Sequence, residues 1–169
     1  MAKAIPTKLD ESLIEQLDRL VSEGLYVSRS ESIRDAVRKL VTERYMNLQR
    51  FYEIISRIAS WVILQRLKGM VTDIILYGSV ARKEANPESD VDFLILTDRE
   101  EGTKAFRRLD EEISRATYPI DLEANVVTTH LLMSRKRFLR LVRERYTFAN
   151  EVLEDGIQLH GSILKHVRG

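Results

Sequence analysis

Residues 74–96 read IILYGSVARKEANPESDVDFLIL, and this stretch decides the fold of the larger part of the chain. Each end of it is a short apolar run with the length and composition of a buried β-strand. Gly78 and Ser79 directly follow the first run, and Asp90 and Asp92 open the second. We therefore expect two strands, with the Gly-Ser pair and both carboxylates at strand ends.

These polar residues suit a phosphate and a metal ion. Gly78 lets the backbone turn sharply and lets a phosphate approach its amides, and Ser79 adds a hydroxyl donor. Asp90 and Asp92 lie two residues apart, so their side chains point to the same face of a strand. Two carboxylates beside a phosphate site are typical of a Mg²⁺ ion whose remaining ligands come from substrate phosphates.

The segments GSVAR at 78–82 and SDVDF at 89–93 resemble the signature of the minimal nucleotidyltransferases, the smallest members of the DNA polymerase β superfamily. The resemblance extends over about residues 45–160. It implies an α+β fold in which residues 45–169 form a polymerase β-like domain, with a mixed β-sheet covered by helices.

The same resemblance implies a Mg²⁺-dependent enzyme with a two-metal site. Such an enzyme moves a nucleoside monophosphate from ATP or another nucleoside triphosphate onto a hydroxyl and releases pyrophosphate. Asp90 and Asp92 would be catalytic metal ligands, and Gly78 and Ser79 would cradle the β and γ phosphates.

The family's third carboxylate, which is both catalytic and a metal ligand, matches Asp121 in the run PIDLE. We expect it on a strand over residues 120–127, where Glu123 lies on the same face and is the alternative. Arg82 is expected either to bind a phosphate of the nucleotide or to pin the loop to a carboxylate. Lys83 stands where the family commonly has glycine.

Residues 1–44 form a separate unit. Residues 4–9 alternate in polarity and predict a short strand, and two amphipathic helices follow, the first ended by Gly24 and the second opened by a capping box from Ser28 to Glu31. So small a unit cannot bury enough apolar surface alone, so we expect it to pair with a second copy. It resembles a ribbon-helix-helix domain of the CopG and Arc type, which implies a homodimer whose paired strands enter the major groove of operator DNA.

The positions that this second family uses on DNA can be carried over. Ala4, Pro6 and Lys8 would face the groove, and Ser28 and Arg29 would face a phosphate. Neither Ala4 nor Pro6 has a hydrogen-bonding side chain, and the unit holds eight basic and eight acidic side chains. It lacks the basic excess of a typical phosphate-binding surface, so DNA binding and dimerisation alone both stay open.

The two units are joined by an uninterrupted helical pattern. No glycine or proline occurs between Ser30 and Lys68, so one helix is expected to run through, or to break only slightly near Arg44. Trp61 is expected in the core of this region. A later amphipathic helix over residues 106–116 should cover the sheet.

Composition narrows the class of protein. The chain has 169 residues, 44% of them hydrophobic, and no cysteine, which excludes disulfides and thiolate metal sites. No apolar run approaches the roughly 18 residues of a membrane span, and the N-terminus lacks the apolar core of a signal peptide. We therefore expect a cytoplasmic protein. A net charge of +1 argues against general electrostatic binding of nucleic acid.

Taken together, the patterns predict a homodimer that couples a ribbon-helix-helix module to a nucleotidyltransferase. The resemblance implies that the acceptor is a partner protein, since many minimal nucleotidyltransferases are antitoxins that attach AMP to a tyrosine of a HEPN-type toxin. A tRNA end or a small antibiotic-like molecule is the alternative acceptor. The rival hypothesis is a DNA-binding transcriptional regulator whose nucleotidyltransferase fold serves mainly for partner or nucleotide binding.

Overall fold

The computed structural model describes residues 8–168, and at Tyr45 the backbone alone. The chain divides into two compact units, with the boundary between Arg44 and Tyr45. Most of the predicted N-terminal strand, including Ala4 and Pro6, lies outside the described residues.

Helix α1 (Glu11–Ser22) of the N-terminal unit is bounded by local hydrogen bonds. Asp10 caps its start, because the carboxylate accepts a hydrogen bond of 2.8 Å from the amide of Leu13. Gly24 ends it with a φ of +70°, a left-handed conformation that glycine adopts without cost. The predicted stop at Gly24 is confirmed.

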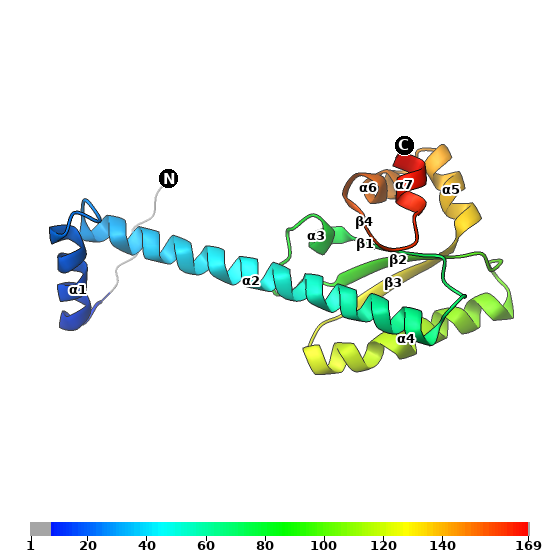
Figure 1. Ribbon diagram of the computed structural model, residues 1–169, viewed down its shortest axis with the longest axis horizontal. Helices are drawn as coiled ribbons and strands as arrows, with labels where there is room; N and C mark the ends of the chain where they lie inside the picture. The colour runs from blue at the N-terminus through cyan, green and yellow to red at the C-terminus, as the bar shows by residue number, and fades with distance from the viewer. Residues whose placement is uncertain (1–7, 169) are drawn as a thin grey trace. The chain divides into compact units, whose positions relative to one another are not determined.

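Helix α2 (Arg29–Arg66) begins with the predicted capping box. The Ser28 hydroxyl accepts a 3.2 Å hydrogen bond from the amide of Glu31, whose carboxylate accepts one of 2.8 Å from the amide of Val27. The helix then continues without a break into the C-terminal unit, as its sequence indicated (Figure 1).

The C-terminal unit is built around a four-stranded sheet. Its further elements are β1 (Asp73–Tyr77), α3 (Gly78–Ala81), β2 (Val91–Thr97), α4 (Lys104–Ala124), β3 (Thr128–Ser134), α5 (Arg135–Arg143), α6 (Thr147–Asp155), β4 (Ile157–His160) and α7 (Ile163–Arg168). The strand order is β3-β2-β1-β4; β1 is antiparallel to both of its neighbours, and β2 is parallel to β3. The predicted α+β fold with a mixed sheet is confirmed.

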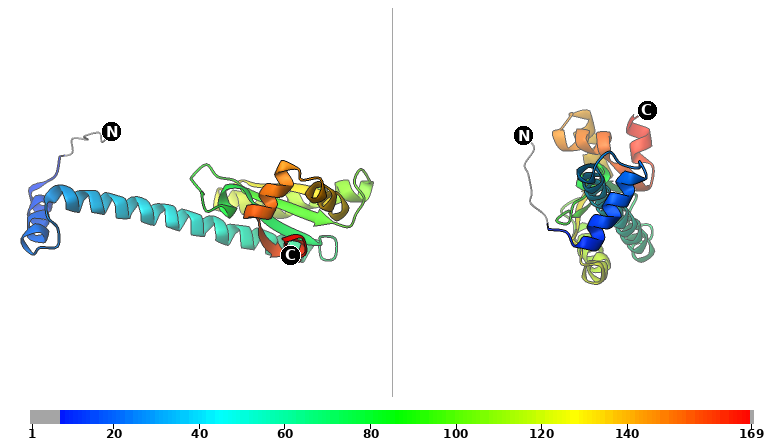
Figure 2. Two further views of the ribbon diagram at one scale, coloured as in Figure 1. Left: turned by 90° about the horizontal axis from the view of Figure 1, so that it is seen from above. Right: turned by 90° about the vertical axis from the view of Figure 1, so that its left-hand side faces the viewer.

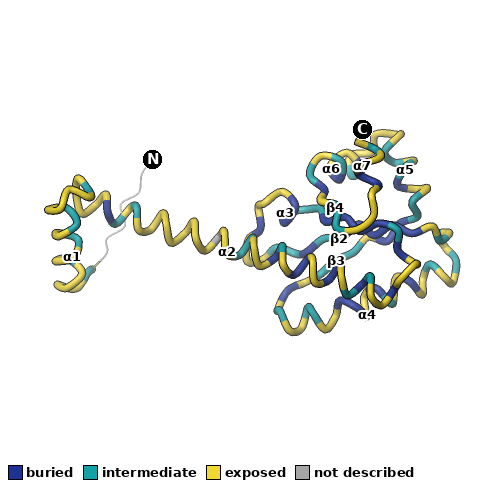
Figure 3. Tube along the Cα trace, in the orientation of Figure 1, coloured by how far each residue is buried: buried dark blue, intermediate teal, exposed yellow. Residues whose placement is uncertain are grey.

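Alternating side chains of the strands bury both faces of the sheet. Ile74 and Leu76 of β1 belong to a cluster with the later part of α2 and with α4, whereas Ile75 belongs to a cluster with α5, α6 and α7. Figures 1 and 2 show α4 and the three C-terminal helices on opposite sides of the sheet, and Figure 3 shows the strands as its most buried part. The sheet is thus a rigid layer between two helical layers.

The strand expected over residues 120–127 is wrong, because α4 continues to Ala124. Apolar positions at helical spacing persist through Ile120, which packs against the core, and this burial holds the helix together past Pro119. Proline leaves the carbonyl of Arg115 without its helical donor. The Arg66 guanidinium reaches the same carbonyl, at 3.4 Å.

Trp61 is not in the core, contrary to the expectation from the sequence. Its side chain lies on the outer side of α2 and is 62% exposed. None of the helices within residues 8–168 is long and apolar enough to cross a membrane.

The fold predicts a specific stabilising role for Asp73, a buried carboxylate at the start of β1. It accepts hydrogen bonds of 2.9 Å from the amides of Ser162 and Ile163 at the start of α7. Asp73→Ala should lower the free energy of unfolding by about 3 kcal/mol, because it leaves buried donors without an acceptor. Urea denaturation measures this, with exposed Asp98→Ala as the control; equal stability of the two variants would contradict the role.

Candidate active site

The ends of β1 and β2 bring Gly78 against the carboxylate of Asp92. The antiparallel register pairs Tyr77 with Asp92, so the residue after Tyr77 must pass this side chain. Gly78 has a φ of +75°, and a Cβ added there would lie 2.3 Å from Oδ2 of Asp92. Glycine is therefore favoured twice, by the backbone conformation and by the close approach, since a Cβ would force the Asp92 carboxylate to move.

Asp92 is fixed from the opposite side by Thr129. The parallel register pairs the two residues across β2 and β3, and the Thr129 hydroxyl donates a 2.6 Å hydrogen bond to Oδ1 of Asp92. The carboxylate is half-buried. Burial raises the pKa of the neighbouring Tyr77 phenol, and the charge of Asp92 raises it further.

Asp90 lies two residues before Asp92 and is also half-buried. It lines a small pocket of about 160 Å³ together with Tyr52 of α2, Ser89 and Val126. Burial raises the pKa of the Tyr52 phenol, with a further contribution from the negative charge of Asp90. The two carboxylates thus lie at the N-terminal end of the inner strand β2, as the sequence predicted.

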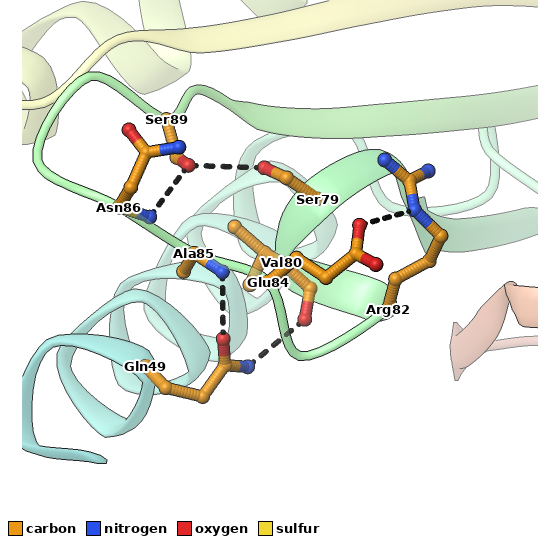
Figure 4. A network of polar contacts seen from close by, with 8 residues as sticks. All are labelled: Gln49, Ser79, Val80, Arg82, Glu84, Ala85, Asn86 and Ser89. Atoms are coloured by element: carbon orange, nitrogen blue, oxygen red, sulfur yellow. Dashed lines mark hydrogen bonds and ion pairs between the residues drawn. The ribbon is translucent and has the colours of Figure 1, made fainter. Parts of the chain in front are cut away.

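Ser79 at the start of α3 is hydrogen-bonded to the far end of the loop that joins α3 to β2 (Figure 4). Its hydroxyl donates a 3.1 Å hydrogen bond to the hydroxyl of Ser89, which accepts another of 2.9 Å from the amide of Asn86. Ser89 directly precedes Asp90. The hydroxyl that was predicted to face a phosphate therefore also sets the position of the carboxylate segment.

Gln49 of α2 clamps the same loop, as Figure 4 shows. Its amide nitrogen donates to the carbonyl of Val80 at 2.9 Å, and its amide oxygen accepts from the amide of Ala85 at 3.3 Å. The sequence gave no sign of this role, because a single glutamine within a helix has no distinguishing pattern. Thr129 was missed for a related reason, since its contact appears only with the register of β2 and β3.

Lys83, which stands where the resemblance led us to expect glycine, adopts a left-handed conformation that glycine favours. Its φ is +63°. The amides of Lys83 and Glu84 bond to the carbonyls of Val80 and Ser79, the pattern by which a helix ends on a left-handed residue. Arg82 pairs with Glu84 at 2.8 Å, so in this structure it holds the loop to a carboxylate, which was one of its two expected roles.

Asp121 is not on the strand that was predicted for it. It lies in the last turn of α4, where its carboxylate accepts hydrogen bonds from the amide and the hydroxyl of Thr128, at 3.1 and 3.2 Å. Burial raises its pKa, and these hydrogen bonds oppose the rise. Glu123 is exposed on the same helix, and the face that it was expected to share with Asp121 is wrong, because residues two apart on a helix project in different directions.

The donor set fits a magnesium ion that arrives with a nucleotide better than a preformed metal cage. Within residues 8–168, no three histidine, aspartate or glutamate side chains gather as a metal-binding group, so the predicted union of Asp90, Asp92 and Asp121 is not seen. Mg²⁺ commonly binds through one or two carboxylates and takes its other ligands from phosphates and water. Asp90 and Asp92, close to the turn that begins at Gly78, match that mode.

Of the described residues proposed for DNA contact, Ser28 and Arg29 have local structural roles and Lys8 is exposed. Lys8 is exposed and precedes α1. Ser28 is occupied as the cap of α2, and Arg29 forms a two-pronged ion pair with Asp18 that lowers the pKa of the carboxyl, chiefly through their hydrogen bond. Arg29 would have to leave Asp18 to reach a phosphate.

Comparison with known families separates the two units. Residues 59–146, slightly more than half of the chain, match the family described as nucleotidyltransferase domain. Residues 8–44 match the ribbon-helix-helix proteins of the copG family. Both resemblances inferred from the sequence are confirmed.

Relatives and solved structures match only in part. A protein described as a nickel-responsive regulator, from Anaeromyxobacter sp. (strain K), is 43% identical over 44 residues, which are 26% of this chain and 32% of that protein. A protein of the same description from Anaeromyxobacter dehalogenans (strain 2CP-C) is 41% identical over 44 residues. The chain thus spans only 32% of the length of these relatives.

Two solved structures are similar at low identity. One, described as a toxin-antitoxin with AMP-PNP, has 17% identity and a TM-score of 0.42, over 66% of this chain and 79% of that chain. The other, the toxin-antitoxin MntA-HepT, has 16% identity and a TM-score of 0.36, over 65% and 74%. Similarity at this level supports no inference about activity or partner.

The contact between Gly78 and Asp92 predicts a coupled effect on stability. Gly78→Ala should cost about 1–3 kcal/mol, because it combines left-handed strain with the clash against Asp92. In an Asp92→Ala background only the strain should remain. Gly102→Ala is the control for strain alone, since Gly102 has a φ of +81° and nothing within 4 Å of an added Cβ.

Urea denaturation of the four variants and the wild type gives the coupling energy. A Gly78→Ala cost that is unchanged by Asp92→Ala, or equal to that of Gly102→Ala, would contradict the contact.

Proposed function

The chain belongs to the nucleotidyltransferase domain family, and from this premise we propose that it transfers a nucleoside monophosphate from a nucleoside triphosphate, with ATP as the expected donor, to a hydroxyl acceptor. The observation that carries the proposal is the side-chain-free approach of Gly78 to Asp92. This approach sets the backbone of Gly78 beside the Asp92 carboxylate with no side chain between them, which puts backbone suited to a phosphate next to an oxygen suited to Mg²⁺.

The proposed roles follow from the places of the side chains. Asp90 and Asp92 would hold Mg²⁺ on the triphosphate, while the backbone of Gly78 and the hydroxyl of Ser79 would orient the β and γ phosphates. When bound, the ion neutralises the charge of the phosphates and polarises the bond to the leaving group. Thr129 would keep one oxygen of Asp92 fixed so that the other faces the ligand.

The reaction is a displacement at the α phosphorus. The acceptor oxygen forms a bond to this phosphorus, the bond to the bridging oxygen breaks, and pyrophosphate leaves. The acceptor proton must pass to a base. Asp121 was expected in this role; burial raises its pKa, and it would have to release Thr128 to act.

The acceptor is proposed by resemblance alone. Minimal nucleotidyltransferases that act as antitoxins modify a HEPN-type partner, and we propose such a protein, in the cytoplasm, as the first acceptor to test. A tRNA end and a small antibiotic-like hydroxyl compound are the other candidates.

Nucleotide transfer tests the proposal directly. Asp90→Asn and Asp92→Asn should each reduce transfer by about 100-fold or more, since each removes a charge that holds the metal. Triphosphates labelled at the α phosphate would be incubated with Mg²⁺ and the three kinds of acceptor, and label on the acceptor would be counted. Asp98→Asn, at the other end of β2, is the matched control and should keep full activity.

Asp121→Asn separates a catalytic from a structural role for this residue. Loss of transfer with retained nucleotide binding would support the third carboxylate, whereas full activity would exclude Asp121 from that role. Full activity of Asp92→Asn, with any acceptor, would overturn the proposal.

A second candidate function is DNA-binding regulation by the N-terminal unit. Its support is the match of residues 8–44 to the ribbon-helix-helix family and the description of the relatives as regulators. This unit leaves Val37, Leu40 and Val41 exposed on α2, which favours a homodimer that covers them. In this function the nucleotidyltransferase fold would mainly bind a partner or a nucleotide.

Two variants separate dimerisation from DNA binding: one should lose both properties, and the other should lose only part of its DNA affinity. Leu40→Glu should convert a dimer at micromolar concentration into a monomer and abolish binding of promoter DNA. Lys8→Ala should keep the dimer and reduce the slope of affinity against salt by about one. Sedimentation and salt titration measure the two properties; a monomeric wild type, or no preference for promoter over random DNA, would contradict the regulator.

A further inference from the structure

The later part of α2 is apolar on two sides, and only one side is covered. Within the C-terminal unit, Tyr52, Ile55, Ala59 and Ile63 are buried against the sheet. On the other side, four large apolar side chains follow the same helix: Phe51 is 39% exposed, Ile54 48%, Ile58 44% and Trp61 62%. We call these four residues the α2 stripe. Figure 3 shows exposed and buried residues alternating along this part of the helix.

The spacing of the α2 stripe is that of a helical interface. Its members follow one another at intervals of three, four and three residues, so they form one line along the helix. Ten residues at 1.5 Å each give a length of about 15 Å. That length suits about three turns of a partner helix laid along the stripe.

The charges beside the α2 stripe are mainly basic. Arg50 and Arg57 each precede a member of the stripe by one residue, and Glu53 precedes Ile54 on the same flank. Glu53 is the only carboxylate in the sequence from residue 45 to residue 68, and Gln49 donates a 2.9 Å hydrogen bond to it. The surface therefore combines an apolar line with a flank of two arginines and one glutamate, which is positive on balance.

The apolar line and its basic flank together favour one kind of binding partner. Two copies of the α2 stripe that faced each other would bring their arginines together, which like-charge repulsion disfavours. An acidic flank on the partner would instead pair with Arg50 and Arg57. Tryptophan and arginine are also the residues that most often carry binding energy at interfaces.

We propose that the α2 stripe is a docking surface for an acidic amphipathic α-helix of a partner protein. The apolar face of that helix covers the four side chains, and its glutamates or aspartates lie against Arg50 and Arg57. This surface does not depend on nucleotide transfer, so either proposal stands if the other fails.

Trp61 gives the experiment its signal, because it is the only tryptophan in the chain. The probe is a helical peptide of about 20 residues with leucines at the same three-four-three spacing and glutamates on both flanks. A twin peptide carries lysines in place of the glutamates. Titration of the full chain with the acidic peptide should shift the emission of Trp61 to shorter wavelength, and the lysine twin should bind at least tenfold more weakly.

Two variants test the role of charge. Arg57→Glu should reverse the preference between the peptides, whereas Arg143→Glu on α5, the matched control, should leave it unchanged. Equal binding of both peptides would mean unspecific apolar contact and would overturn the proposal. Failure of the acidic peptide to bind would also overturn it. The same holds if dilution of the free protein shifts Trp61 emission to longer wavelength, because that shift would show that a second copy covers the stripe.

Discussion

The close contact between Gly78 and the carboxylate of Asp92 constrains the rest of the site. Because β1 and β2 are antiparallel, with Tyr77 opposite Asp92, the chain must leave β1 directly past this carboxylate. Any Cβ at residue 78 would meet Oδ2. The turn into α3 follows from this passage, and the hydrogen bonds of Ser79 to Ser89 and of Gln49 to the loop then return the chain to Asp90.

The loop that follows α3 contains a residue in a strained backbone conformation. Three helices in the described part of the chain end with the same pair of backbone hydrogen bonds, on Gly24, Lys83 and Arg145. Only the first is a glycine; at the other two a side chain sits in the left-handed region, which costs about 1–2 kcal/mol. At Lys83 the hydrogen bonds of Gln49 to both sides of the turn offset this cost and keep the loop beside the carboxylates.

The sequence predicted the strands, the turn and the carboxylate pair because these depend on neighbours in the chain. Strand length, the Gly-Ser pair and the two-residue spacing of Asp90 and Asp92 are local properties. Asp121 and Trp61 were misplaced because their positions depend on distant packing. The stripe that ends in Ile120 keeps α4 helical past Pro119, and the apolar surface of α2 is wider than the sheet can cover. Hydrogen bonds such as Thr129 to Asp92 need the strand register, which no local pattern supplies.

Asp92, beside Gly78, should hold a divalent cation only together with a nucleotide. Mn²⁺ can replace Mg²⁺ at oxygen ligands and is visible by electron paramagnetic resonance. Titration of the protein with Mn²⁺, in the presence and absence of ATP and with ATP alone as the blank, should give Mn²⁺ on the protein, beyond that held by free ATP, only when ATP is present. Asp92→Asn should abolish this binding, and Asp121→Asn should retain it. Equal binding of Mn²⁺ and ATP by the wild type and Asp92→Asn would contradict the account.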